Sequence, residues 1–397
     1  MTTAQNCKQS PLKAWLPVIG LTFSAFVFNT SEFVPIGLLT DIANTFQTSE
    51  AHAGLLITVY AWVVAIASLP LMVVFSNVEF RRLLLSVVVL FIASHLLSAC
   101  ATTYTMLMAS RIGVACSHAI FWSIASPLAV HVAPEGRRAT ALSLIITGTS
   151  VAMIVGLPMG RVIGLHLGWR MTFFCIAMAA LAVFLLLSLI FPKVPASDKM
   201  SFTQLPALLR TPALKAVYIM TIIAITGHYT GYSYIEPFLG QVAKLSDSLI
   251  TLALTLFGLV GLLGSVLFSR YYDKCPGRFA RFAVLGMTAF LLLLHLASFN
   301  TYTILALCVL WGLAVTFYNL VFNSAIIQIA PHATSIAMAA YSGIFNVGIG
   351  GGALVGGIVC TQLSIGWIGY VGGAIGIIAS LYCVKRVMPL LRETNAA

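Results

Sequence analysis

The sequence predicts an all-α membrane protein with twelve transmembrane helices in two pseudo-symmetric six-helix halves. Three observations support this prediction: the composition, the number of long apolar runs and an internal repeat. Hydrophobic residues make up 60% of the 397-residue chain and charged residues only 8%, whereas soluble domains carry about 25% charged residues. The mean hydropathy of +1.02 likewise indicates that lipid surrounds most of the chain.

Twelve apolar runs are each long enough to cross a hydrocarbon layer of about 30 Å. They are continuous rather than alternating, which favours helices over the strands of a β-barrel. No cleavable signal peptide is expected, because the polar leader continues directly into the first run. The expected spans are residues 15–39, 52–74, 82–101, 104–130, 139–165, 169–192, 213–240, 248–270, 279–298, 302–328, 334–362 and 366–388.

The sequence repeats itself at about half its length. The segment APEGRRATAL (133–142) matches APHATSIAMA (330–339), and LGWRM (167–171) matches IGWIG (365–369). We therefore expect six-helix halves at 1–191 and 213–397, joined by a polar, proline-containing cytoplasmic linker at 192–212. Two halves around a midplane site are typical of secondary transporters, which alternate access by rocking one half against the other.

The positive charge lies mainly on one side of the predicted topology. Of the 21 Lys and Arg residues, 17 fall in segments on the same side as the N-terminus. This asymmetry predicts a multi-pass protein of a bacterial inner membrane with both termini in the cytoplasm. It also explains the net charge of +11 without a nucleic-acid partner. The eight cysteines form no Cys-x-x-Cys pair, so we expect neither a metal site nor a disulfide framework.

Three charged residues, Glu32, Arg111 and Glu236, lie deep inside apolar runs. A charge at bilayer depth costs on the order of 3 kcal/mol, so it usually pairs, binds a ligand or relays protons. Glu32 and Arg111 each lie about seven residues, or ~10 Å, below the outer membrane surface. We expect them to form a proton-coupling ion pair. A static pair that fixes helix register is the alternative.

Glu236 precedes Pro237, which should kink the seventh span. His228, Tyr232 and Glu236 share a helix face, because they follow one another at intervals of four residues. We predict that Glu236, His228 and His118 take part in proton coupling, since histidine titrates near neutral pH. The alternatives are an interfacial charge for Glu236 and plain interhelical hydrogen bonds for the histidines.

A neutral sugar would need hydrogen-bonding side chains and flat aromatic faces. The same residues could instead join helices or face lipid. The candidate sugar ligands are Asn29, Tyr60, Trp122, Tyr232, Trp311, Tyr318, Asn319, Asn323 and Asn346.

Motifs in the fourth and fifth spans resemble those of the major facilitator superfamily. Arg111-Ile112-Gly113 is similar to the span-four arginine motif of proton-coupled members, and GLPMG (156–160) is similar to the antiporter motif of exporters, although Leu157 separates its Gly and Pro. The loop between spans two and three departs from the family's usual acidic and basic pattern. We expect the glycines of spans five and eleven to pack the two halves together and limit leak. The antiporter-motif residues are Gly148, Gly156, Pro158, Gly160 and Gly164.

Longer stretches resemble the drug/proton antiporter-like branch, and within it bacterial sugar efflux transporters of the SotB type. They are NTSEFVPIGLL (29–39), YAWVVAIASLP (60–70), the region of Arg111, His118 and Trp122, and YSYIEPF (232–238). The resemblance implies proton-coupled export of arabinose-like pentoses and small galactosides, with the proton as coupling ion and no other cofactor. The implied partners are the sugar, protons and the lipid bilayer, and a monomer is expected.

Three other functions stay open at this level. A multidrug/proton antiporter would use the same antiporter motif, and only the lining of its site would differ. A non-transporting receptor is disfavoured by the intramembrane charges and by the lack of a sizeable soluble domain. An enzyme is not expected, because no nucleotide-binding loop, zinc motif or nucleophile elbow occurs in the sequence.

Overall fold

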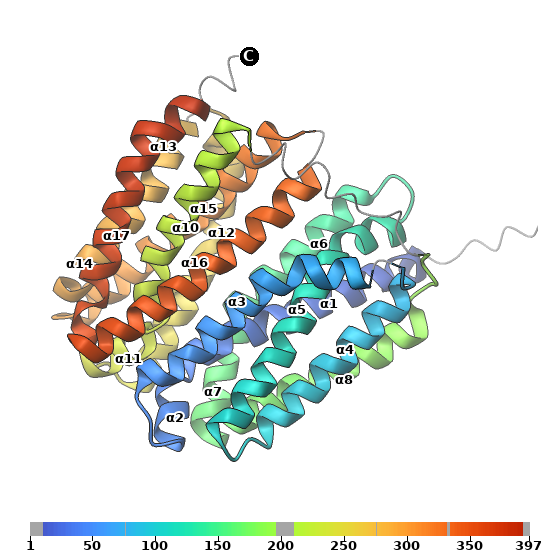
Figure 1. Cartoon of the computed structure of the whole chain (residues 1–397), viewed down its shortest axis with the longest axis horizontal. Coiled ribbons are helices and arrows are strands. Elements are labelled where there is room, and N and C mark those ends of the chain that lie inside the picture. Colours follow the sequence, from blue (N-terminus) through green and yellow to red (C-terminus); the bar gives the residue numbers. More distant parts are fainter. Residues whose placement is uncertain (1–10, 76, 196–209, 275, 332–333, 392–397) are drawn as a thin grey trace, which may run out of the picture.

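The computed structural model describes residues 11–75, 77–195, 210–274, 276–331 and 334–391 (Figure 1). Within these ranges the chain is helical, with short connections and no strand. Long apolar sequences take this form because a helix satisfies all its backbone hydrogen bonds internally, as lipid requires. Most of the predicted linker lies outside the described residues.

Six predicted spans make up the first part of the chain. The fifth span is an α-helix, a π-helical turn and a second α-helix in succession, and Pro158 begins its last part. A short helix, α2, follows the first span. The elements are α1 (Pro11–Gly37), α2 (Leu39–Thr45), α3 (Glu50–Val74), α4 (Phe80–Ala99), α5 (Tyr104–Val132), α6 (Arg138–Val151), η1 (Ala152–Gly156), α7 (Leu157–Leu167) and α8 (Trp169–Ile190).

The second part of the chain repeats this plan, and π-helical turns interrupt its ninth and twelfth spans. Its elements are α10 (Pro212–Tyr232), α11 (Ile235–Gln241), α12 (Asp247–Tyr271), η3 (Tyr272–Lys274), α13 (Pro276–Arg281), η4 (Phe282–Gly286), α14 (Met287–Ala297), α15 (Thr301–Ile329), α16 (Thr334–Gln362), η5 (Ile365–Trp367), α17 (Ile368–Tyr382) and η6 (Cys383–Val387).

The seventh predicted span, 213–240, is broken into α10 and α11 at Ser233 and Tyr234. Pro237 has no N–H to donate to the carbonyl of Ser233, so the helix restarts with Pro237 in its first turn. Within the described ranges, eleven helices are long and apolar enough to cross a membrane, and α10 is not among them. Its polar residues include Thr221, His228 and Thr230, all of which are buried in protein rather than exposed to lipid.

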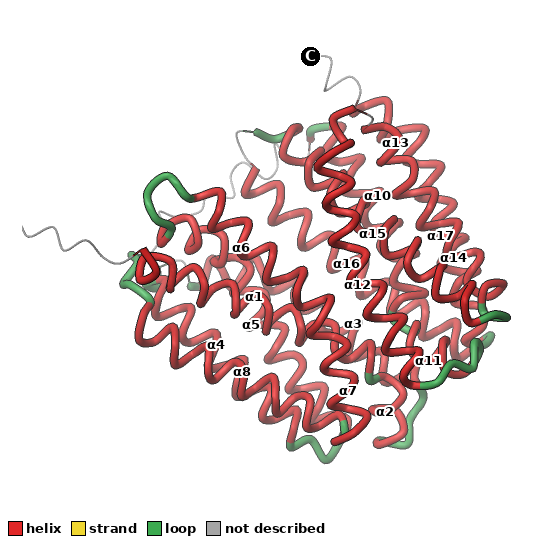
Figure 2. Tube along the Cα trace, turned by 180° about the vertical axis from the view of Figure 1, so that it is seen from behind, coloured by secondary structure: helices red, strands yellow, loops and turns green. Residues whose placement is uncertain are grey.

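Two ends of the bundle can be distinguished. We call the end with residues 75–80, 133–138 and 191–195 the linker end, and the end with residues 38–50, 100–104 and 241–247 the far end. Helices α2, α7 and α11 lie together at the far end, at the lower left of Figure 1 and the lower right of Figure 2. The two sets of six spans diverge from there towards the linker end.

The polar contacts between the two halves are concentrated between mid-helix and the far end. Among the described residues, side-chain hydrogen bonds join Thr40 to Glu236, Glu50 to Gln241 and Trp62 to the carbonyl of Val347. Arg161 of α7 pairs with Glu236 and Asp247. The far end is therefore closed in this structure.

The expected packing of the span-five glycines between halves is wrong. Added Cβ atoms at Gly148, Gly156, Gly160 and Gly164 would meet Thr22, Thr30, Val34 and Leu38 of α1, in the same half. These glycines let span five approach span one closely, as small residues do in membranes. Span five reaches the other half through different residues: the carbonyl of Met153 faces Gly258 of α12.

In span eleven the expectation is partly met. Gly350 lies against Trp62 of α3 and Gly357 against Ala51, so these two glycines do pack the halves together. Gly348 and Gly352 instead face α10, in the same half.

Candidate functional site

Glu32 of α1 lies at the centre of a polar cluster in the first half. Its Oε2 is 3.6 Å from Nε2 of His118 on α5. The Glu32 side chain keeps 12% of its surface exposed, against 4% for His118. The carboxylate is thus within reach of solvent while most of its surroundings are protein.

Arg111 of α5 is only 1% exposed and makes no ion pair with Glu32 in the described structure. Its Nη1 donates to the carbonyl of Ser31 at 3.2 Å and to the Ser31 hydroxyl at 3.4 Å. The guanidinium carbon lies 4.5 Å from the centre of the Tyr60 ring, in cation–π range. The structure therefore places the two expected partners in one cluster but gives each a different nearest contact.

Aromatic rings enclose this cluster. The His118 ring lies 5.6 Å from that of Tyr60 and 5.9 Å from that of Trp122. Phe28 stacks on Phe121 with ring centres 4.2 Å apart. Such apolar walls lower the local dielectric constant, so any change of charge on Glu32 acts strongly on its neighbours.

A second cluster occupies the other half. His228 and Tyr232 of α10 stack with ring centres 5.2 Å apart, and Trp311 of α15 meets them edge-on at 5.3 and 6.0 Å. Phe257 of α12 stacks on Tyr232 at 4.7 Å. Tyr229 joins the two clusters, because it packs on His228 and interacts electrostatically with Glu32 across the halves.

Several buried polar atoms in these clusters have no hydrogen-bond partner among the described residues. They are the Tyr60 hydroxyl, Nδ1 of His118, Nδ1 of His228 and Nε1 of Trp311. Unpaired buried polar atoms are costly, so these four atoms would gain from a hydrogen bond to a polar ligand or to water.

The other candidate ligands are partly committed to the protein. The Tyr318 hydroxyl donates to Thr221 at 3.0 Å. The amide of Asn29 donates to the carbonyl of Thr149. Asn319 and Asn346 donate to carbonyls one turn back in their own helices, although Oδ1 of Asn346 is unpaired.

Asn323 is half-buried on α15, the helix that also carries Tyr318 and Asn319. Their roles as sugar ligands stay predictions.

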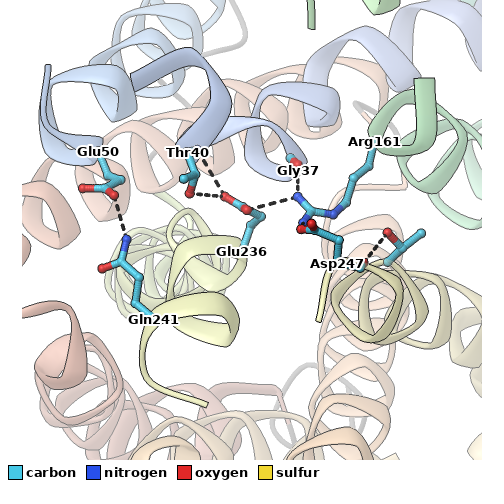
Figure 3. Close-up of polar contacts among 8 residues, drawn as sticks. Gly37, Thr40, Glu50, Arg161, Glu236, Gln241 and Asp247 are labelled. Carbon is cyan, nitrogen blue, oxygen red and sulfur yellow. Dashed lines mark hydrogen bonds and ion pairs between the residues drawn. The ribbon is translucent and has the colours of Figure 1, made fainter. Parts of the chain in front are cut away.

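A charged network joins the halves at the far end (Figure 3). Oε1 of Glu236 is 3.1 Å from Nη1 of Arg161, and its Oε2 accepts from the amide and hydroxyl of Thr40 at 3.2 and 2.8 Å. Arg161 also pairs with Asp247 at 3.0 Å and donates to the carbonyl of Gly37. We call Thr40, Arg161, Glu236 and Asp247 the far-end latch.

All the polar contacts that the structure shows for Glu236 are to Thr40 and Arg161 of the latch. None of them is to Glu32 or His118. The i+4 spacing from His228 therefore does not bring Glu236 into the same cluster, because the helix is broken between them at residues 233–234.

Asp41 of α2 lies beside the latch, outside the membrane-spanning helices. Its pKa is raised above the ordinary value of 3.8, chiefly by burial. The charge of Arg161 opposes this increase and the charge of Asp247 adds to it. The Asp41 carboxyl is thus a weaker acid in this closed arrangement than an ordinary aspartate.

Sequence reasoning missed Arg161, Ser31 and His95. Arg161 is 1% exposed, and its position directly after Gly160 of the antiporter motif was the available signal. His95 was visible as a lone histidine within an apolar run. Nothing in the sequence distinguishes Ser31 from other membrane serines.

A family model described as the Major Facilitator Superfamily matches residues 21–333 and, in a second match, residues 217–396. The chain belongs to the Major Facilitator Superfamily.

Solved structures of this superfamily share its fold. A bacterial homologue of the human lysosomal transporter Spinster, inward-facing and unoccupied, is 16% identical with a TM-score of 0.73, and the match covers 98% of each chain. A D-xylose–proton symporter is 16% identical with a TM-score of 0.76, covering 94% of this chain and 98% of that one.

A POT family transporter in complex with a thioalcohol-conjugated peptide is 12% identical with a TM-score of 0.77, covering 94% and 96%. At these identities the likeness establishes the fold. This superfamily member is therefore a multi-pass membrane transporter for small molecules.

Proposed function

We propose that the protein exports small neutral sugars, such as arabinose-like pentoses and small galactosides, in exchange for protons. The observation that carries this proposal is Glu32: a half-buried carboxylate, 3.6 Å from His118 and beside Arg111. A carboxylate whose ionisation depends on its neighbours is suited to bind and release a proton as access changes.

The orientation follows from the charge distribution. With the positively charged linker end in the cytoplasm of a bacterium, the model is closed to the outside by the far-end latch. In the proposed cycle, Glu32 takes a proton from the outside in the opposite state. Reorientation then exposes Glu32 to the cytoplasm, where proton release accompanies sugar binding.

The driving force is sufficient for uphill export. One proton moving inwards supplies ~1.4 kcal/mol per pH unit and ~2.3 kcal/mol per 100 mV of membrane potential. Each 1.4 kcal/mol supports a tenfold sugar gradient at one proton per sugar.

The aromatic clusters support a sugar as cargo. Trp311, Tyr232 and Tyr60 supply aromatic rings to the two clusters, and Nε1 of Trp311 and the Tyr60 hydroxyl are buried without partners among the described residues. A pyranose or furanose ring presents both apolar C–H faces and hydroxyl groups, so it would satisfy both features.

A multidrug/proton antiporter is the second candidate. It is favoured by the dense apolar packing of His228, Tyr232, Phe257 and Trp311, which would suit a planar apolar compound. The engagement of Asn29, Asn319 and Asn346 with helix carbonyls also reduces the polar groups free for a sugar.

The decisive experiment uses full-length protein in liposomes with an imposed pH gradient and radiolabelled arabinose. Glu32→Gln should abolish gradient-driven accumulation, while sugar-for-sugar exchange persists. Glu135→Gln, at an exposed loop residue of the linker end, is the matched control. Undiminished accumulation by Glu32→Gln would remove Glu32 from the mechanism, and transport of ethidium but not arabinose would favour the multidrug function.

A further inference from the structure

Ser31 and His95 form a hydrogen-bonded pair beside the Glu32 cluster. Both side chains are 0% exposed. Nε2 of His95 on α4 is 2.8 Å from the Ser31 hydroxyl, and its Nδ1 is 2.9 Å from the carbonyl of Phe91, one turn back. Both ring nitrogens of His95 therefore have protein partners, whereas Nδ1 of His118 and Nδ1 of His228 have none among the described residues.

The carbonyl of Phe91 fixes the direction of these bonds. A carbonyl only accepts, so Nδ1 of His95 carries the hydrogen. In the neutral ring, Nε2 then has a free lone pair and accepts from the Ser31 hydroxyl. The Ser31 oxygen keeps its own lone pairs for a further donor.

That donor is Arg111. Its Nη1 lies 3.2 Å from the carbonyl and 3.4 Å from the hydroxyl oxygen of Ser31, and its Nε has no partner among the described residues. Ser31 thus supplies all the hydrogen-bond acceptors that the described structure gives to this guanidinium. A continuous directed chain runs from Arg111 through Ser31 and His95 to Phe91.

We propose that Ser31 and His95 are positioning residues that hold Arg111 over the Tyr60 ring and away from Glu32, and so set the pH at which Glu32 exchanges its proton. This inference rests on the proposed function. It adds two residues that neither touch the cargo nor carry the exchanged proton.

Glu32 has four titratable or charged neighbours on three helices. They are His118 and Arg111 from α5, Tyr60 from α3 and Tyr229 from α10. Among these, only Arg111 carries a permanent positive charge. Loss of the Ser31 hydroxyl leaves only the backbone carbonyl to hold Arg111. With one acceptor in place of two, the guanidinium turns more readily towards the carboxylate of the next residue. A carboxylate paired with arginine stays ionised to lower pH.

The test follows the infrared carbonyl band of the protonated Glu32 carboxyl in full-length protein, titrated with pH. The band is identified by its loss in Glu32→Gln. Ser31→Ala should shift its midpoint to lower pH by about one unit or more, the usual effect of an adjacent arginine. Ser31→Cys, which keeps the shape of the side chain but replaces the oxygen with a weak acceptor, tests the same point if Ser31→Ala folds poorly.

His95 provides the second arm. His95→Leu should shift the midpoint in the same direction as Ser31→Ala, whereas His95→Gln, whose amide oxygen can still accept from Ser31, should restore the wild-type value. Ser24→Ala is the matched control, because Ser24 is equally buried on α1 but bonds the carbonyl of Gly20.

The outcomes separate the inference from the proposed function. A band that is lost in Glu32→Gln but unmoved in Ser31→Ala, Ser31→Cys and His95→Leu overturns the positioning role alone. If no titrating carboxyl band is lost in Glu32→Gln, Glu32 is not the proton site, and both the inference and the proposed function are overturned. A shift in Ser31→Ala with none in Ser24→Ala supports the inference.

Discussion

A Cβ atom added to Gly54 of α3 would lie 2.7 Å from Cζ of Tyr234 and closer still to its hydroxyl. Tyr234 sits at the break between α10 and α11 and donates to the carbonyl of Ala353 at 3.0 Å. The two residues belong to different halves, so the absence of a side chain at position 54 is what admits the tyrosine when the far end is closed.

Gly54→Ala should therefore disfavour the closed far end. Overpacking costs about 1–3 kcal/mol, which lowers the ratio of closed to open molecules at least about fivefold. Spin labels at the exposed residues Asn44 and Ser248, in a cysteine-free background, would report a longer distance. Gly261→Ala is the control, since its Cβ would meet nothing nearer than 3.5 Å. Adding Tyr234→Phe should relieve part of the effect, and strict additivity would count against this contact.

The latch gives a second prediction, based on unequal burial of two ion pairs. Arg161→Met leaves Glu236, only 7% exposed, as an unpaired buried charge, which costs about 3–5 kcal/mol in the closed state. The same spin-label pair should show the far end largely open. Arg161→Met combined with Glu236→Gln should close it again in part.

Asp247→Asn provides the contrast within the same network. The Asp247 side chain is 69% exposed, and such pairs contribute below ~1 kcal/mol because water and salt screen them. The distance distribution should stay close to that of the wild type. A large opening in Asp247→Asn would mean that burial does not decide the strength of the latch.

Asp41 predicts how external pH acts on the far end. Its pKa is raised above 3.8, mainly by burial, in the closed state. The closed state therefore binds the proton more tightly than an open, hydrated state, and acidification through the range just above 3.8 should favour closure. At neutral pH the ionised carboxylate opposes closure, so Asp41→Asn should increase the closed fraction there and flatten its pH dependence. Arg161, Asp247 and Glu236 also face this region, so the quantity to compare is the difference between wild type and Asp41→Asn across pH.

Trp311 gives a prediction on cargo. Trp311→Phe keeps an aromatic ring but removes the Nε1–H, which has no partner within the described part of the chain. If that group donates to a hydroxyl, arabinose should bind roughly two- to tenfold more weakly, the usual worth of one neutral hydrogen bond. Ethidium binding should change little. Trp367→Phe at an exposed far-end position is the matched control, and both affinities can be measured by isothermal titration calorimetry in detergent.

The helices themselves were largely predictable, because hydropathy alone decides which segments lipid can accept. Spans such as α5 and α16 begin where the apolar runs begin. The break in the seventh span was foreseen only as a kink at Pro237, since the sequence does not show whether neighbouring helices will keep the freed carbonyl in a helix or a turn.

The partners within the site were harder to predict. Glu32 and Arg111 were expected at similar depth, and Arg111 does contact the residue before Glu32. Depth does not fix rotation about the helix axis, however, and in the structure His118 lies against Glu32 while Ser31 accepts from Arg111. Arg161 lies near the end of its expected span, where a charge usually reaches water, so its sequence position does not reveal its burial. Its partners Glu236 and Asp247 come from α11 and α12 of the other half. The glycines of span five showed the same limit: a small-residue stripe predicts close packing but not against which helix.

The concentration of contacts between the two halves near one membrane surface has a mechanical consequence. The two halves are joined near one surface and separate towards the other. The residues that join them determine the lifetime of each conformation, whereas the interior residues determine which solute binds. Turnover speed and solute choice should therefore evolve separately in this molecule, through changes in different regions of the chain.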